Sequence, residues 1–261
     1  KYVPPKEWRE IQTVDAHTGG ESLRIIISGY PELKGKSVLE KRKNAKENFD
    51  SFRKSLIWEP RGHADMYGAI IVEPDSSDSH FGVIFVHNEG YSTGCGHAVI
   101  ALTKVFVEAG LIPMNEPETE VRMDVPSGFI RSFAKIENGK VVSVRFKNVP
   151  SFVQKLNAEV NIPRLGKIKY DLAFGGAFYA FVDVNQVGLD CSERNYKSLI
   201  ETGMHIKREI TKTVKMNHPT EREMNYLYGT IFTGPPKDPM NHSRNVCIFA
   251  NGELDRSPTG T

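Results

Sequence analysis

Hydrophobic and polar positions along this 261-residue chain form short runs that predict many strands and a few helices. Residues 81–86 are apolar and include β-branched side chains, as expected of a buried strand. After a glycine-rich turn, residues 98–109 are apolar on nearly every side, which is typical of a helix inside a protein. Gly110 is suited to end that helix. We expect the rest of the chain to be organised around this strand, turn and helix.

The same order of elements is predicted twice along the chain. The first half should contain strands at about 11–17, 23–27, 69–72 and 81–86, with an amphipathic helix at about 38–57. The second half should contain strands at about 177–182, 227–232 and 245–250, with a helix at about 196–214. Self-similarity with such a long period indicates two matching subdomains. We assign these to residues 1–155 and 156–261.

Cys95 lies in the glycine-rich turn, immediately before the buried helix. Unpaired backbone amides and the positive end of a helix dipole stabilise anions there, so they favour the thiolate over the thiol. The neighbouring Gly94 and Gly96 leave room for a ligand to approach the backbone. A packed structural cysteine is the alternative, because cysteines are often buried.

In the repeat, Thr259 occupies the position that corresponds to Cys95. If the two lobes face each other, these residues lie on opposite sides of one cleft, where ligands commonly bind. Four backbone amides at this cleft would hold a carboxylate: those of Gly96, His97, Gly260 and Thr261. Cys95 would then remove a proton from the adjacent carbon, and Asp255 would pair with a substrate amine. The sequence therefore predicts an α-amino or imino acid as the small-molecule substrate.

Composition excludes several other classes of function. A net charge of +2 without a basic stripe argues against a nucleic-acid partner. The chain has no apolar run of membrane-spanning length and no signal peptide, so we expect no membrane partner. Three sparse cysteines, Cys95, Cys191 and Cys247, suit a reducing compartment and predict a cytoplasmic location. Nucleotide-binding and zinc-binding motifs are missing from the sequence, so we expect neither a cofactor nor a metal.

Two motifs resemble the signatures of the proline racemase family. They are Gly94-Cys95-Gly96-His97 and residues 255–261, and the similarity extends over nearly the whole chain from residues 15–20 onward. The resemblance implies an α/β (α+β) fold like that of diaminopimelate epimerase. Two pseudo-symmetric lobes would each wrap a mixed sheet around a central helix. It also implies catalysis without a cofactor, and it allows a homodimer.

The resemblance adds two further expectations. It places Ile70 near the substrate, although a core role fits the strand around this residue better. Family members also continue past Thr261 with the second central helix and more strands, so we expect Thr261 not to be the natural end of the protein.

The pair of central residues distinguishes activities within the family. Racemases and 4-hydroxyproline epimerases have cysteine at both positions, whereas this chain has Cys95 and Thr259. This pair resembles the members that dehydrate trans-3-hydroxy-L-proline to Δ1-pyrroline-2-carboxylate by Cα proton abstraction and β-elimination of water. The resemblance thus implies catalytic roles for both residues. Proline racemase or hydroxyproline 2-epimerase activity is the alternative, and Thr259 argues against it.

Two unrelated functions fit the sequence less well. A cysteine hydrolase needs a histidine base beside the thiol, but His97 is two residues along the same helix and does not face Cys95. A protein that only binds its ligand would have no use for the thiol. The role of His97 stays open between a general acid for the leaving hydroxide and a simple backbone donor at the helix N-terminus.

Overall fold

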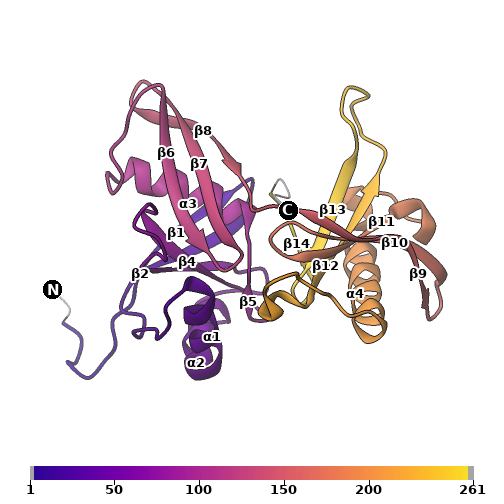
Figure 1. The fold of residues 1–261 in the computed structure, drawn as a ribbon, viewed down its shortest axis with the longest axis horizontal. Helices are drawn as coiled ribbons and strands as arrows, with labels where there is room; N and C mark the ends of the chain where they lie inside the picture. Colours follow the sequence, from indigo (N-terminus) through magenta and orange to yellow (C-terminus); the bar gives the residue numbers. More distant parts are fainter. Residues whose placement is uncertain (1–2, 258–261) are drawn as a thin grey trace. The chain divides into compact units, whose positions relative to one another are not determined.

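The computed structural model describes residues 3–257 of the chain (Figure 1). These residues form two compact units. The first unit comprises Lys1–Tyr91 and His97–Lys147, and the second comprises Ser92–Gly96 and Asn148–Thr261. The sequence predicts a boundary between residues 155 and 156, whereas the units divide between residues 147 and 148. In addition, the short segment that carries Cys95 is grouped with the second unit.

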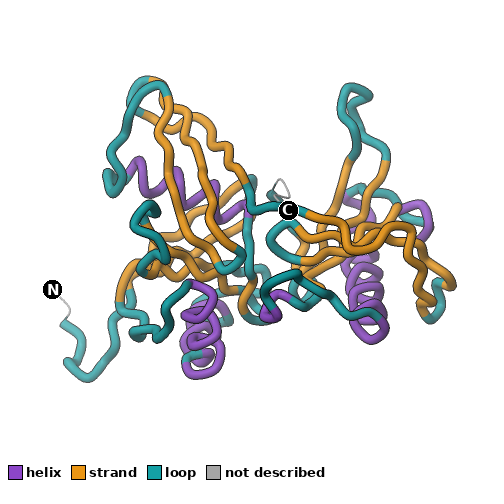
Figure 2. The backbone as a smooth tube through the Cα atoms, viewed as in Figure 1, coloured by secondary structure: helices purple, strands orange, loops and turns teal. Residues whose placement is uncertain are grey.

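The first unit is built on a mixed sheet (Figure 2). Its strands are β1 (Gln12–Thr18), β2 (Glu21–Ser28), β3 (Gly68–Val72), β4 (Phe81–Val86), β5 (Tyr91–Ser92), β6 (Glu118–Val125), β7 (Gly128–Glu137) and β8 (Lys140–Lys147). They are ordered β1-β2-β3-β4-β6-β7-β8, with β5 paired to β4. The pairs β2–β3 and β4–β6 are parallel, and the β1–β2, β3–β4, β6–β7 and β7–β8 pairs are antiparallel.

Two short helices connect β2 to β3, where the sequence predicts one helix over about 38–57. They are α1 (Val38–Asn48) and α2 (Asp50–Ile57). Phe49 leaves the helical conformation, with φ −133° and ψ 19°, and its amide donates to the carbonyl of Ala45 to end α1. Asn48 and Asp50 favour helix ends over helix interiors, which explains the break. The prediction of one continuous helix is therefore wrong at this point.

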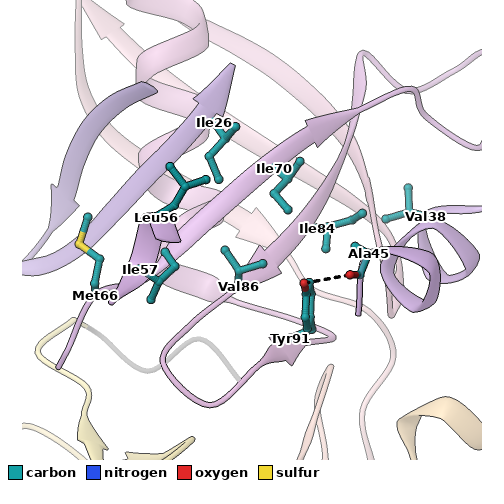
Figure 3. Close-up of a cluster of buried hydrophobic side chains, with 10 residues drawn as sticks. All are labelled: Ile26, Val38, Ala45, Leu56, Ile57, Met66, Ile70, Ile84, Val86 and Tyr91. Carbon is teal, nitrogen blue, oxygen red and sulfur yellow. Dashed lines mark hydrogen bonds between the residues drawn. The ribbon is translucent and has the colours of Figure 1, made fainter. Parts of the chain in front are cut away.

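The α1–α2 connection covers one side of the sheet and encloses a hydrophobic core (Figure 3). The core residues are Ile26, Val38, Ala45, Leu56, Ile57, Met66, Ile70, Ile84, Val86 and Tyr91. Every residue of β4 is buried, which confirms the prediction from its uninterrupted apolar run. Burying this much aliphatic surface is the main source of stability in such a unit.

The helix after the glycine-rich turn is α3 (Gly96–Glu108). Most of its residues are buried, while Lys104 and Glu108 form an exposed ion pair at 2.7 Å. Gly110 has φ +73°, a left-handed conformation that glycine adopts easily, so the predicted end of the helix is confirmed.

The second unit contains a six-stranded sheet. Its strands are β9 (Phe152–Ile162), β10 (Gly166–Phe174), β11 (Phe178–Asp183), β12 (Leu227–Gly234), β13 (Arg244–Phe249) and β14 (Glu253–Leu254), in that spatial order. Helix α4 (Tyr196–Thr213) connects β11 to β12, and short 3-10 turns occur at η1 (Val184–Val187), η2 (Glu193–Asn195) and η3 (Arg222–Met224). Gly203 brings α4 close to the sheet, where its carbonyl accepts a 3.0 Å hydrogen bond from the Thr230 hydroxyl.

The two units repeat one topology, as the sequence predicts. The run β10, β11, α4, β12 and β13 follows the same order and strand directions as β1, β2, α1–α2, β3 and β4, and each run continues into a two-residue strand, β14 or β5. Gly68 of β3 pairs with Val86, and Gly229 of β12 pairs with Phe249, so these positions are equivalent. The predicted fold of two sheet lobes is confirmed. Through residue 257, the second unit has no counterpart of α3.

Candidate active site

The turn that carries Cys95 is held against the loop before β11. The hydroxyl of Thr93 donates a 2.5 Å hydrogen bond to the carbonyl of Gly176. A Cβ atom on Gly94 would lie only 3.2 Å from Gly176 Cα, so a side chain there would push the two backbones apart by a few tenths of an ångström. Cys95 itself is a buried thiol with 8% of its surface exposed. The turn is therefore fixed directly before Cys95, a residue that has little solvent contact.

Helix α3 begins directly after Cys95, so Gly96 and His97 provide the first amides of a helix. The N-terminus of a helix presents backbone amides that can bind an anion. The carbonyl of His97 accepts a 2.9 Å hydrogen bond from the Thr18 hydroxyl. The buried imidazole of His97 packs edge to face against the ring of Tyr67, with 4.8 Å between the ring centroids. Tyr67 in turn stacks on His87, with 5.7 Å between the centroids. This packing fixes the first turn of α3.

Asp255 follows β14 and is held by local hydrogen bonds. One of its carboxylate oxygens, Oδ1, accepts from the backbone amide of Ser257 at 2.9 Å and from the Ser257 hydroxyl at 2.6 Å. The amide of Asp255 donates to the carbonyl of Cys247 at 3.0 Å. Burial raises the pKa of the Asp255 carboxyl, and the hydrogen bonds from Ser257 oppose that shift. A carboxylate in this position would gain from a cationic partner such as a substrate amine.

Comparison with known proteins gives the same family as the motifs. The family model described as "Proline racemase" matches residues 13–261. The chain belongs to the proline racemase family.

Its relatives include proteins that are named dehydratases. One, from Colwellia psychrerythraea (strain 34H), is named trans-3-hydroxy-L-proline dehydratase and is 48% identical over 99% of this chain and 73% of its own length. Another, from Xenopus tropicalis, is named trans-L-3-hydroxyproline dehydratase and is 44% identical over 99% of this chain and 75% of its own.

An epimerase and a solved structure also match. A Burkholderia multivorans protein named 3-hydroxyproline 2-epimerase is 45% identical over 97% of this chain and 76% of its own length. The crystal structure of a hydroxyproline epimerase from Agrobacterium vitis, with bound trans-4-hydroxy-L-proline, superposes with a TM-score of 0.91 at 31% identity. That comparison covers 97% of this chain and 74% of the other. Proteins of this proline racemase fold thus include both dehydratases and epimerases by name.

The residues proposed for the site fall into three groups. The second unit contains Cys95, Gly96 and Asp255, and the following residue His97 belongs to the first unit. Thr259, Gly260 and Thr261 lie outside the described residues. Ile70 has 1% of its surface exposed and belongs to the core shown in Figure 3, in agreement with the core role that its strand suggests.

Two partners of the Cys95 turn were missed in the sequence. Thr18 binds the carbonyl of His97, and the carbonyl of Gly176 binds Thr93 from 83 residues further along the chain. Thr18 ends β1 directly before Gly19 and Gly20, and Gly176 lies in the bend between β10 and β11. The doubled glycines were visible as markers of the repeat, but nothing in the sequence paired either turn with the Cys95 segment.

Within residues 3–257, no group of three or more His, Cys, Asp or Glu side chains is arranged to hold a metal ion. Over the same residues, no helix has both the length and the apolar character needed to cross a membrane.

Proposed function

We propose that this member of the proline racemase family removes water from trans-3-hydroxy-L-proline. The observation that carries the proposal is the placement of Cys95 directly before the N-terminus of α3, in a chain whose relatives bear the names of trans-3-hydroxy-L-proline dehydratases. A substrate carboxylate would accept hydrogen bonds from the amides of Gly96, His97, Gly260 and Thr261. Asp255 would hold the ring nitrogen.

The reaction would begin with transfer of the Cα proton to the Cys95 thiolate. Negative charge would pass into the carboxylate, which is surrounded by amide donors, in the manner of an oxyanion hole. The electron pair then forms the C2–C3 double bond as the C3–oxygen bond breaks, and the leaving hydroxide takes a proton to become water. The enamine product, Δ2-pyrroline-2-carboxylate, tautomerises to the Δ1 imine.

Thr259 would decide between elimination and epimerisation. Two-base epimerisation needs an acid on the face opposite Cys95 whose pKa is near the working pH, and a cysteine thiol meets that need at about 8.5. A threonine hydroxyl is far too weak an acid. The carbanion formed by Cys95 would therefore recover its proton from the same face or expel the C3 hydroxyl. A hydroxyl at C4 is not placed for this elimination.

Epimerisation at C2 of the same substrate is the second candidate, because one relative is named 3-hydroxyproline 2-epimerase. The test is incubation with trans-3-hydroxy-L-proline, trans-4-hydroxy-L-proline and L-proline, followed by mass spectrometry and chiral chromatography. We expect loss of one water from the 3-hydroxy compound alone and no D-isomers. Accumulation of a D-isomer would favour the epimerase. Replacing Thr259 with cysteine should introduce some epimerase or racemase activity.

The remaining expectations concern the setting of the enzyme. The proposed reaction proceeds without a cofactor or metal, since Cys95 and the amide donors supply the base and the charge stabilisation. The sparse cysteines favour a cytoplasmic location. A homodimer also remains a prediction, and light scattering in solution tests it.

A further inference from the structure

Positively charged side chains are buried beneath the turns that lead to the proposed site. They lie on the helices that connect parallel strands: Arg42 on α1, Arg53 on α2 and Lys207 on α4. Their exposed fractions are 3%, 3% and 8%. Arginine and lysine are rarely buried so fully unless they are paired, so each position calls for a structural reason.

In the first unit, both arginines bind carbonyls of the segment between β4 and Cys95. Arg42 donates to the carbonyl of Tyr91 at 2.7 Å. Arg53 donates to the carbonyls of His87 and Asn88 at 2.8 and 2.9 Å. These are charge-assisted hydrogen bonds, which are stronger than bonds between neutral groups. They fix the path of the chain as it approaches the reactive thiol.

In the second unit, Lys207 binds the corresponding turn. It lies on the buried side of α4 with Leu199, Gly203 and Ile210, and its ammonium group donates to the carbonyl of Ala250 at 2.5 Å. Ala250 has φ +46°, a left-handed conformation that is uncommon for residues other than glycine. The lysine thus holds a backbone position that alanine does not favour.

The two sets of contacts occur at equivalent places. Val86 and Phe249 pair with the equivalent glycines of β3 and β12, so the next residues, His87 and Ala250, correspond to each other. Each offers its carbonyl to a buried cation on the connecting helix. Asp255 lies five residues beyond Ala250, and its amide is tied back to β13.

We propose that Lys207 is a positioning residue that holds the Ala250–Gly252 turn so that Asp255 meets the ring nitrogen of the substrate. In the same way, Arg53 would position the segment that leads to Cys95 through its bonds to the carbonyls of His87 and Asn88. The assignment of a substrate to Asp255 rests on the proposed function, whereas the effect of Lys207 on the turn does not. Loss of the lysine should release Ala250 from its left-handed conformation and loosen the β13–β14 connection.

The test compares Lys207→Met with Lys212→Met, an exposed lysine on the same helix that pairs with Glu209. Hydrogen–deuterium exchange is followed at the amides of Gly252 and Asp255, which donate to the carbonyls of Phe249 and Cys247. We expect both amides to exchange faster in Lys207→Met than in the unmodified protein. In Lys212→Met their exchange rates should be unchanged. The KM for trans-3-hydroxy-L-proline should rise by about tenfold or more, with a smaller change in kcat.

Two further variants exclude a general loss of folding. Lys207→Arg keeps a buried donor and should restore slow exchange and a low KM. Ala250→Gly combined with Lys207→Met should recover much of the loss, because glycine adopts the left-handed conformation without steric cost. Unchanged exchange and KM in Lys207→Met would overturn the proposal, as would failure of both rescues. If the unmodified protein does not act on the substrate, the proposed function fails, while the exchange data still decide the role of Lys207.

Discussion

The two matching turns of the repeat share a backbone plan but differ in how they are held. The first turn, which ends at Cys95, leaves its own sheet and is fixed by the Thr93 hydroxyl on Gly176 of the second unit. The second turn stays on its own sheet, where the amide of Asp255 binds β13 and Ser257 binds the carboxylate. The first turn therefore has a contact 83 residues away in the sequence, whereas the second is held by Lys207 of α4 and by residues close to Asp255 in the sequence.

This difference shows how one duplicated scaffold can supply two chemistries. The N-terminus of α3 directly after Cys95 favours a negative charge at that point, as a base requires. A buried carboxylate has its pKa raised and gains from a positive ligand. We therefore expect substitutions in the first turn to affect mainly the rate, and substitutions in the second to affect mainly binding.

The largest effect is expected for Cys95→Ala. Removing the proposed base should reduce kcat by about 10²–10⁴-fold or to background, since general base catalysis contributes that much. The thermal unfolding midpoint should change little, because alanine fits a helix start and the side chain is small. Two measurements check this: the rate of imine formation gives kcat, and a thermal melt gives the unfolding midpoint. Substantial residual activity would remove Cys95 from the role of base.

Asp255→Asn should come next and should act on binding. Asparagine keeps an acceptor for Ser257 but loses the charge that would pair with the substrate amine. Loss of one partner of such a charge pair typically costs about 2–5 kcal/mol. We expect a large rise in KM with a smaller fall in kcat, measured by steady-state kinetics. An unchanged KM would place the amine elsewhere.

A smaller loss is expected when the first turn is displaced. Gly94→Ala brings a Cβ to 3.2 Å from Gly176 Cα, so the turn must shift. A displacement of about 1 Å can cost as much as 10²-fold in rate, and relief of this contact needs only a few tenths of an ångström, so we expect a loss below that. Gly90→Ala is the matched control, because a Cβ there meets no atom within 4 Å. Equal activity of the two variants would mean that the contact with Gly176 does not position Cys95.

The smallest effect concerns stability and pH. Burial raises the folded-state pKa of Asp255 above its unfolded value, so the native state holds this proton more tightly. The stabilisation is fully present below the unfolded pKa and is lost as the pH rises through the folded pKa. Asp255→Asn has no carboxyl group to titrate, so its stability should not fall in this way. As the pH rises from acidic to neutral, the thermal unfolding midpoint of the variant should therefore rise relative to that of the unmodified protein. A constant difference across that range would contradict the raised pKa.

Local periodic signals in the sequence predicted much of the fold. The apolar run of β4, the buried helix ending at Gly110 and the repeated order of elements all follow from patterns within a few residues. The break at Phe49 was missed because the apolar stripe continues through it. The bond from Thr93 to Gly176 was missed because two polar or flexible residues 83 positions apart leave no periodic trace. The glycine neighbours of Cys95 made it a candidate for the site, but nothing in the sequence placed its turn in the second unit.

The central claim is that Cys95 takes the Cα proton from one face and that no acid serves the other. Incubating the protein with L-proline in deuterium oxide tests it, because proline lacks a C3 hydroxyl to expel. Proton NMR and chiral chromatography should reveal deuterium at Cα of L-proline, with no D-proline, and no exchange at all with Cys95→Ala. Deuterated D-proline from the unmodified protein, or continued exchange without the thiol, would contradict the account.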